Sequence, residues 1–259
     1  MGILNYKTVM VVSLALMVIS GLTGLVVYYA HAGVIKSLGG VQTLGEVLDN
    51  VTYLEYKAKD ASGEYLVKIY NNPDERRGTI EVYKDGELAE KYYYEYGNNQ
   101  LILLEKEIGE EKQALDPVEY EEPFLTSVVF EMGQEGGVVG VKTFPGIGPI
   151  YILHYLEGVL GIDWPQLIEP RGAARPPVNL GLEYTRVSSE VGSFFGVRIT
   201  IQPDPTLFFT PLGNWGLGPM VVEAAKVNGV PVAVKFTYTA LLQTGEQTVE
   251  WELVKLETK

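Results

Sequence analysis

Residues 64–96 decide the fold, and they read EYLVKIYNNPDERRGTIEVYKDGELAEKYYYEY. Short segments rich in Val, Ile, Leu and Tyr alternate here with turn residues, which is typical of β-strands joined by tight turns. The dipeptide Asp85-Gly86 is a strong hairpin signal, because a type I′ turn requires positive φ at both central positions. The stretch therefore predicts an antiparallel meander.

The same pattern continues on both sides of this stretch. In the first half we expect strands at Val51–Lys59, Glu64–Tyr70, Thr79–Tyr83, Leu88–Tyr96 and Gln100–Lys106. Later strands are expected at Phe124–Met132, Val138–Thr143, Asn179–Val187, Phe194–Gln202, Met220–Val227, Val230–Leu242 and Gln247–Glu257. One helix is predicted at Pro149–Leu160, where a proline suits the first turn and Gly161 follows the last residue. The acidic residues 105–122 are interpreted as a solvated connection, with a docking site for a cation or a basic partner as the alternative. The predicted fold class is mostly β, in an α+β arrangement.

The amino-terminal part of the chain has a different character. Residues Thr8–Ala32 contain no Lys, Arg, Asp or Glu, and as a helix they would span about 38 Å, more than the roughly 30 Å core of a bilayer. We therefore predict a single transmembrane signal-anchor with a short cytoplasmic tail in residues 1–35. Residues 36–50 would form a linker or short helix, and residues 51–259 a β-rich domain outside the cytoplasm.

A cleaved signal peptide is the alternative for this segment. Ala30-His31-Ala32 fits the small-x-small pattern that signal peptidase recognises, and cleavage after Ala32 would release a secreted protein. The apolar core Val9–Val27 is longer than the roughly 7–15 residues of secretory signals, which favours the retained anchor. Both interpretations place residues 36–259 outside the cytoplasm.

Charge and composition exclude several function classes. All 33 acidic residues and 19 of the 20 basic residues follow position 35. Residues 36–259, which we call the body, therefore carry a formal net charge of −14. Such a charge opposes binding to the phosphates of nucleic acids and to anionic membrane surfaces. The absence of cysteine excludes disulfides, zinc–cysteine sites and thiol catalysis.

The sequence carries no catalytic or metal-binding signature, so we predict a protein that is not an enzyme and has no cofactor. His154 is the only histidine after the membrane boundary, and no spacing supplies it with a nucleophile or with further ligands. Asn50-Val51-Thr52 is a sequon, which makes Asn50 a candidate for glycosylation.

Several short stretches carry a likeness to a known family. They are Glu64–Tyr70, Asn72–Arg77, Thr79–Tyr83, Tyr94–Leu101, Asn228–Pro231 and Thr248–Lys255. In outline, residues 40–257 resemble the LolA-like lipoprotein carriers and related lipid-binding envelope proteins. The resemblance implies an incomplete β-barrel whose concave apolar face is covered by helices and holds acyl chains. Carriers of that family are soluble shuttles, whereas this chain is predicted to stay tethered.

Candidate ligand-binding residues come from two places. The resemblance implies that Pro149–Leu160 covers the concave face, with Ile152, Leu153 and Leu156 toward the cavity. Between Pro203 and Pro219, three large apolar residues lie in a loop that either caps the core or binds a ligand: Phe208, Phe209 and Trp215.

Two functions remain open at this point. The first is a membrane-anchored domain that binds a lipid or another apolar ligand. The second is a structural or interaction protein of the cell envelope, which would offer a strand edge or an apolar patch to another chain. A hollow concave sheet favours the first function, and a filled one favours the second.

Overall fold

The computed structural model describes residues 43–98, 101–133, 138–158, 178–203, 209–210, 213–214, 217–242 and 245–259. The predicted membrane segment Thr8–Ala32 lies outside these ranges. Among the residues that the structure describes, no helix is long and apolar enough to cross a membrane.

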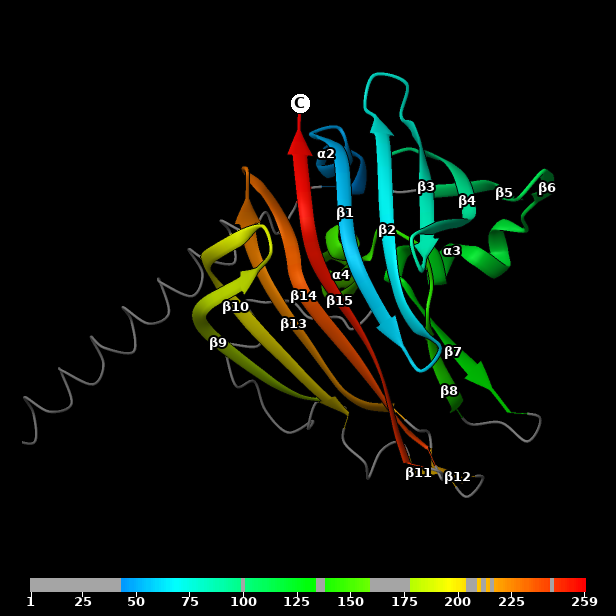
Figure 1. Cartoon of the computed structure of the whole chain (residues 1–259). Helices are drawn as coiled ribbons and strands as arrows, with labels where there is room; N and C mark the ends of the chain where they lie inside the picture. Colours follow the sequence, from blue (N-terminus) through cyan, green and yellow to red (C-terminus); the bar gives the residue numbers. More distant parts are fainter. Residues whose placement is uncertain are drawn as a thin grey trace, which may run out of the picture.

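Most of the described chain is β-structure (Figure 1). The first strands are β1 (Val51–Asp60), β2 (Gly63–Asn72), β3 (Arg77–Lys84), β4 (Glu87–Tyr96), β5 (Leu101–Ile108) and β6 (Glu111–Ala114). The later ones are β7 (Val128–Met132), β8 (Val138–Thr143), β9 (Val178–Ser189), β10 (Gly192–Pro203), β11 (Phe209–Thr210), β12 (Gly213–Asn214), β13 (Leu217–Val227), β14 (Val230–Leu242) and β15 (Gly245–Thr258). The described helices are α2 (Leu44–Leu48), α3 (Pro117–Thr126) and α4 (Gly148–Gly158).

Eleven strands form one antiparallel sheet in the order β6-β5-β4-β3-β2-β1-β15-β14-β13-β10-β9. The predicted meander is confirmed as β1 to β6, and the Asp85-Gly86 turn has the expected positive φ at both residues, 52° and 85°. The last strand of the chain pairs with the first, from Val51 opposite Thr258 to Lys59 opposite Glu250. We call the β1–β15 pair the seam, because it joins the two halves of the sheet.

The sheet is large and open rather than a closed barrel, with β6 and β9 at its two edges. The half-barrel prediction is therefore supported only as far as a mostly β, antiparallel sheet with a few short helices on one side. Edge strand β6 is four residues long and fully exposed, and a short, charged edge of this kind discourages pairing with other chains.

One face of the sheet, which we call the inner face, is covered by other elements. Helix α4 packs on β14, and the β7–β8 hairpin lies against β14, β15 and β1 (Figure 1). Aromatic rings fill this layer: the Tyr56 and Trp251 ring centroids are 4.6 Å apart, and those of Tyr94 and Phe124 are 5.7 Å apart. All four side chains are at most 2% exposed. The opposite face, which we call the outer face, carries the residues that alternate with the buried ones along each strand.

The region between the two halves of the sheet corrects two predictions. Residues 105–122 are not one solvated connection, since β5 continues to Ile108 and is followed by β6 and the start of α3. The predicted strand Phe124–Met132 begins only at Val128, because Phe124 belongs to helix α3 and is fully buried against Tyr94. Pro117 suits the first turn of that helix, and Ser127, with φ of 60°, follows its end. The packing of Phe124 against Tyr94 therefore accompanies a helix in a segment whose sequence pattern predicts a strand.

Asn71 fixes the entry of the chain into the sheet. Its Nδ2 donates hydrogen bonds to the carbonyl oxygens of Leu48 (2.9 Å) and Val51 (2.7 Å), and its Oδ1 accepts one from the Tyr94 hydroxyl (3.1 Å). Only 9% of Asn71 is exposed, so these groups have little access to water. Helix α2 is thereby tied to β2 and β4 next to the start of β1.

Replacing Asn71→Leu should lower the free energy of unfolding by about 3 kcal/mol, because it leaves buried carbonyl and hydroxyl groups without partners. Urea unfolding followed by circular dichroism measures this change. Gln113→Leu, on the exposed edge strand β6, is the matched control and should change stability by less than about 0.5 kcal/mol. Equal effects of the two substitutions would contradict the role of Asn71.

Candidate functional site

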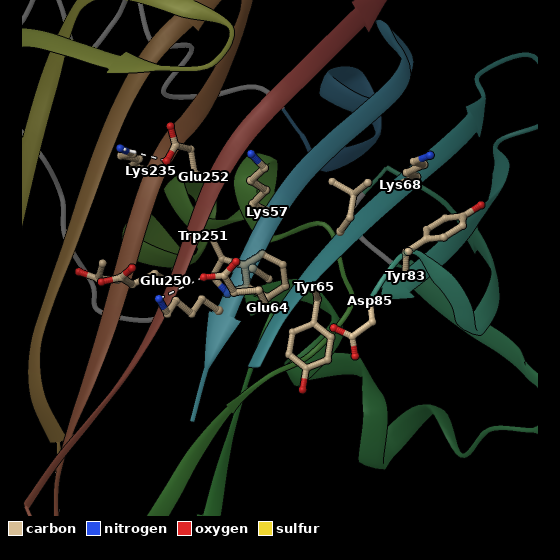
Figure 2. A pocket seen from close by; sticks show the side chains of 15 residues that line it. Lys57, Glu64, Tyr65, Lys68, Tyr83, Asp85, Lys235, Glu250, Trp251 and Glu252 are labelled. Atoms are coloured by element: carbon tan, nitrogen blue, oxygen red, sulfur yellow. Dashed lines mark ion pairs between the residues drawn. The ribbon is translucent and has the colours of Figure 1, made fainter. Parts of the chain in front are cut away.

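A groove of about 810 Å³ lies on the outer face, over the seam (Figure 2). Strands β14, β15, β1, β2 and β3 supply its walls, together with the β3–β4 turn. These strands occupy the middle of the sheet, so their backbone groups are already paired on both sides. The groove can therefore contact a ligand chiefly through side chains. Its volume falls within the range that is usual for small-ligand sites, roughly 300–1,000 Å³.

The charged side chains of the groove balance one another. Four lysines and four carboxylates line it: Lys57, Lys59, Lys68, Lys235, Glu64, Asp85, Glu250 and Glu252. Two ion pairs lie within the groove, Lys59–Glu64 at 3.2 Å and Lys235–Glu252 at 3.1 Å (Figure 2). Within the described ranges, Asp85 and Glu250 take part in no ion pair. These two exposed carboxylates are the acceptors most available to a ligand.

One tyrosine and one leucine give the groove an apolar part. Leu66 and Tyr83 line it at the β2–β3 side, whereas the Tyr65 side chain, opposite Ala58 in the β1–β2 ladder, packs against the core on the inner face. Figure 2 shows Tyr83 and Asp85 on the opposite side of Lys57 from Lys235 and Glu252. The Lys68 ammonium group lies 4.5 Å from the centre of the Tyr83 ring. Such cation–π contacts hold an aromatic ring in place at modest energy. The half-buried Tyr83 ring is thus fixed in orientation before any ligand arrives.

The tip of the β9–β10 hairpin reaches toward the groove across the outer face. Glu190 in this tip forms an ion pair with Lys57, and Val187 near it is only 1% exposed. Gly196 allows β10 to lie close against β13, because a Cβ there would overlap the carbonyl oxygen of Ala224. Phe195, by contrast, is 71% exposed. Lys57 therefore belongs both to the groove and to the contact that positions the hairpin tip.

The hydroxyl of Tyr83 donates a hydrogen bond to Glu81 Oε2 at 2.8 Å, and this bond raises the pKa of Tyr83 to about 12. The Tyr93 hydroxyl, on the same face, donates to Glu107 Oε2 at 2.7 Å, and its pKa is likewise raised to about 12. The outer tyrosines thus stay neutral donors bonded to carboxylates at ordinary pH.

The structure does not gather the predicted ligand-binding residues into this groove. Helix α4 exists at Gly148–Gly158, close to the predicted bounds, and Ile152 is completely buried while Leu153 is half-buried. Leu156 lies in the same helix, and Phe209 lies in β11. Two other predicted residues, Phe208 and Trp215, lie outside the described residues. A ligand role for this set stays a prediction.

Asn50 lies in the exposed turn between α2 and β1, and its Nδ2 donates to the Glu46 carbonyl oxygen at 2.8 Å. Its glycosylation stays a prediction. Among the described residues, no group of three or more His, Asp or Glu side chains is arranged to hold a metal ion.

The sequence interpretation missed the groove because its two halves come from opposite ends of the described chain. The alternation of the strands did show that Lys57 and Lys59 share one face, as do Glu250 and Glu252. No local signal shows that β1 pairs with β15, so the two sets could not be brought together from sequence.

No protein family and no curated protein matches the chain in sequence. In structure, the chain is similar to an uncharacterized conserved protein from Thermus thermophilus, with 13% identity over 83% of each chain and a TM-score of 0.32. It is also similar to a DUF1329 family protein from Desulfovibrio piger, with 7% identity, 83% of this chain and 89% of that chain covered, and a TM-score of 0.34. MucB in a MucA/MucB complex of Pseudomonas aeruginosa matches more weakly, with 9% identity, 83% and 91% coverage and a TM-score of 0.20. Similarity at these scores carries no conclusion about ligand or partner.

The raised pKa values of the outer tyrosines predict a loss of stability in alkali. An unfolded tyrosine ionises near pH 10, so the contribution of the Tyr83–Glu81 bond is complete below pH 10 and is lost as the pH rises toward 12. Tyr83→Phe should therefore flatten the fall in unfolding free energy between pH 10 and 12, measured by urea titrations at several pH values. Tyr93→Phe should act in the same way, and an unchanged slope in both variants would refute this assignment.

Proposed function

We propose that this chain is a membrane-tethered domain outside the cytoplasm that binds a component of the cell envelope through the outer groove. The role is one of binding rather than catalysis. The observation that carries the proposal is the groove itself, with preformed aromatic and charged side chains over the seam of the sheet.

The inner face of the sheet is less suited to binding a ligand than the outer groove. Where the structure describes it, the layer between the sheet and α4 is occupied by aromatic side chains of the protein, including Tyr56, Phe236 and Trp251. An acyl chain at these positions would have to displace rings whose close packing stabilises the domain. The outer groove, in comparison, is accessible without any rearrangement of the core.

Tethering and location outside the cytoplasm rest on the sequence. The 25 uncharged residues Thr8–Ala32 have the length of a membrane helix, and the acidic body that follows would be repelled by anionic headgroups. A domain held near a membrane but kept off its surface is suited to binding a neighbouring envelope component.

Cysteine labelling tests the location, because the chain has no cysteine of its own. Glu110 lies in the exposed β5–β6 turn, and we expect Glu110→Cys to react with a membrane-impermeant maleimide in intact cells. Asn5→Cys should react only after the cells are permeabilised. The reverse pattern would contradict the proposed orientation, and a mature chain that lacks residue 5 would replace the anchor with a cleaved signal.

Photo-crosslinking in the host tests the binding surface. A benzoylphenylalanine at position 83 should give a specific adduct, whereas the same residue at position 93, on the outer face but away from the groove, should not. Adducts at position 93 only, or at neither position, would count against the groove as the binding surface.

A further inference from the structure

From the balance of charges, the Tyr83 ring and the free acceptors in the outer groove, we propose that its ligand is a neutral saccharide chain. This inference rests on the proposed binding role of the groove and adds the chemical class of the ligand.

The balanced charge of the lining argues against strongly charged ligands. A polyanion would meet four carboxylates and a polycation would meet four lysines, so either would gain as much repulsion as attraction. The formal net charge of −14 on the body adds to the repulsion of polyanions. An uncharged ligand avoids both costs.

Hydroxyl groups match this lining better than other uncharged polar groups. Each hydroxyl donates one hydrogen bond and accepts others, so neighbouring hydroxyls can donate to a carboxylate and accept from an ammonium group. Asp85 and Glu250 are exposed and, within the described residues, free of ion pairs, so they can accept without breaking an existing contact. The paired groups Lys59 and Glu64 are exposed as well, and exposed ion pairs are weak enough to be shared with a ligand.

The apolar part of the groove completes the match. The carbon–hydrogen face of a sugar ring carries partial positive charge and packs favourably on the negative face of an aromatic ring. Tyr83 supplies one aromatic ring to the groove and Leu66 lies beside it on the same face, whereas the Tyr65 ring is on the inner face, opposite Ala58. A groove with an aromatic ring and balanced hydrogen-bonding groups therefore matches both the carbon–hydrogen face and the hydroxyl groups of a sugar.

The position of the groove disfavours an extended peptide. Peptides commonly bind sheets by adding a strand to an edge, where main-chain groups are unpaired. The groove lies over β1, with five strands on either side of it in the sheet, and its floor offers no free main-chain edge. A ligand in this place must be recognised by side chains, as saccharides are.

Isothermal titration calorimetry of the full chain in detergent tests the inference, with cellotetraose, mannotetraose and chitotetraose as probes. A heparin tetrasaccharide and tetralysine serve as the charged comparisons. We expect at least one neutral tetrasaccharide to bind, and to bind more tightly than either charged probe. Tyr83→Ala, Asp85→Asn and Glu250→Gln should each weaken that binding about tenfold. Asparagine at position 85 preserves the preference of the β3–β4 turn for positive φ.

The matched controls are Tyr93→Ala and Glu110→Gln, which lie outside the groove and should bind as the unmodified chain does. Circular dichroism and the urea midpoint verify that each variant is folded. The inference is overturned if no neutral tetrasaccharide binds at millimolar concentration, if a charged probe binds more tightly, or if the groove variants bind normally. A polypeptide adduct at position 83 in cells, without saccharide binding, would overturn this inference and leave the proposed binding role standing.

Discussion

The antiparallel pairing of β1 with β15 is the constraint on which the rest of the structure depends. It joins the two ends of the described chain, and it turns a six-stranded meander and a five-stranded carboxyl-terminal set into one sheet. Closing so long a loop costs conformational entropy, and the contacts across the seam must offset that cost. Beneath the seam, Tyr56 of β1 packs edge-on against Trp251 of β15, and Trp251 stacks on Phe236 of β14. Aromatic packing therefore links the first strand of the sheet to its carboxyl-terminal strands.

The same pairing separates two kinds of surface. Tyr56 and Trp251 face inward at the seam, while the neighbouring Lys57 and Glu252 face outward. Lys57 forms an ion pair with Glu190, and Glu252 forms one with Lys235. A slip of one residue in this register would exchange the two faces, so the buried rings hold the polar groove in place. Stability of the core and geometry of the groove are thus set by one register.

Local patterns in the sequence were sufficient to predict most strands, but they did not predict which segments pack against one another. The Asp85-Gly86 turn was predictable because aspartate and glycine tolerate positive φ. Asn228-Gly229, between β13 and β14, follows the same rule, since all four residues have positive φ. At Gly146 the structure requires a glycine for lack of space, because a Cβ there would overlap the carbonyl oxygen of Phe124. That contact, like the helical state of Phe124 and the groove across the seam, depends on residues distant in the chain. Periodicity carries no information about such partners.

Hydroxyl-radical footprinting of the full chain tests the central claim, that the outer groove is the occupied surface, most directly. The protein would be footprinted in its native membranes and again after purification in detergent. Occupation of the groove predicts that Leu66 and Tyr83 are protected in membranes and become reactive on purification, while Tyr93 on the same face reacts equally in both. Equal reactivity of Tyr83 in the two states, or protection confined to α4, would contradict the account.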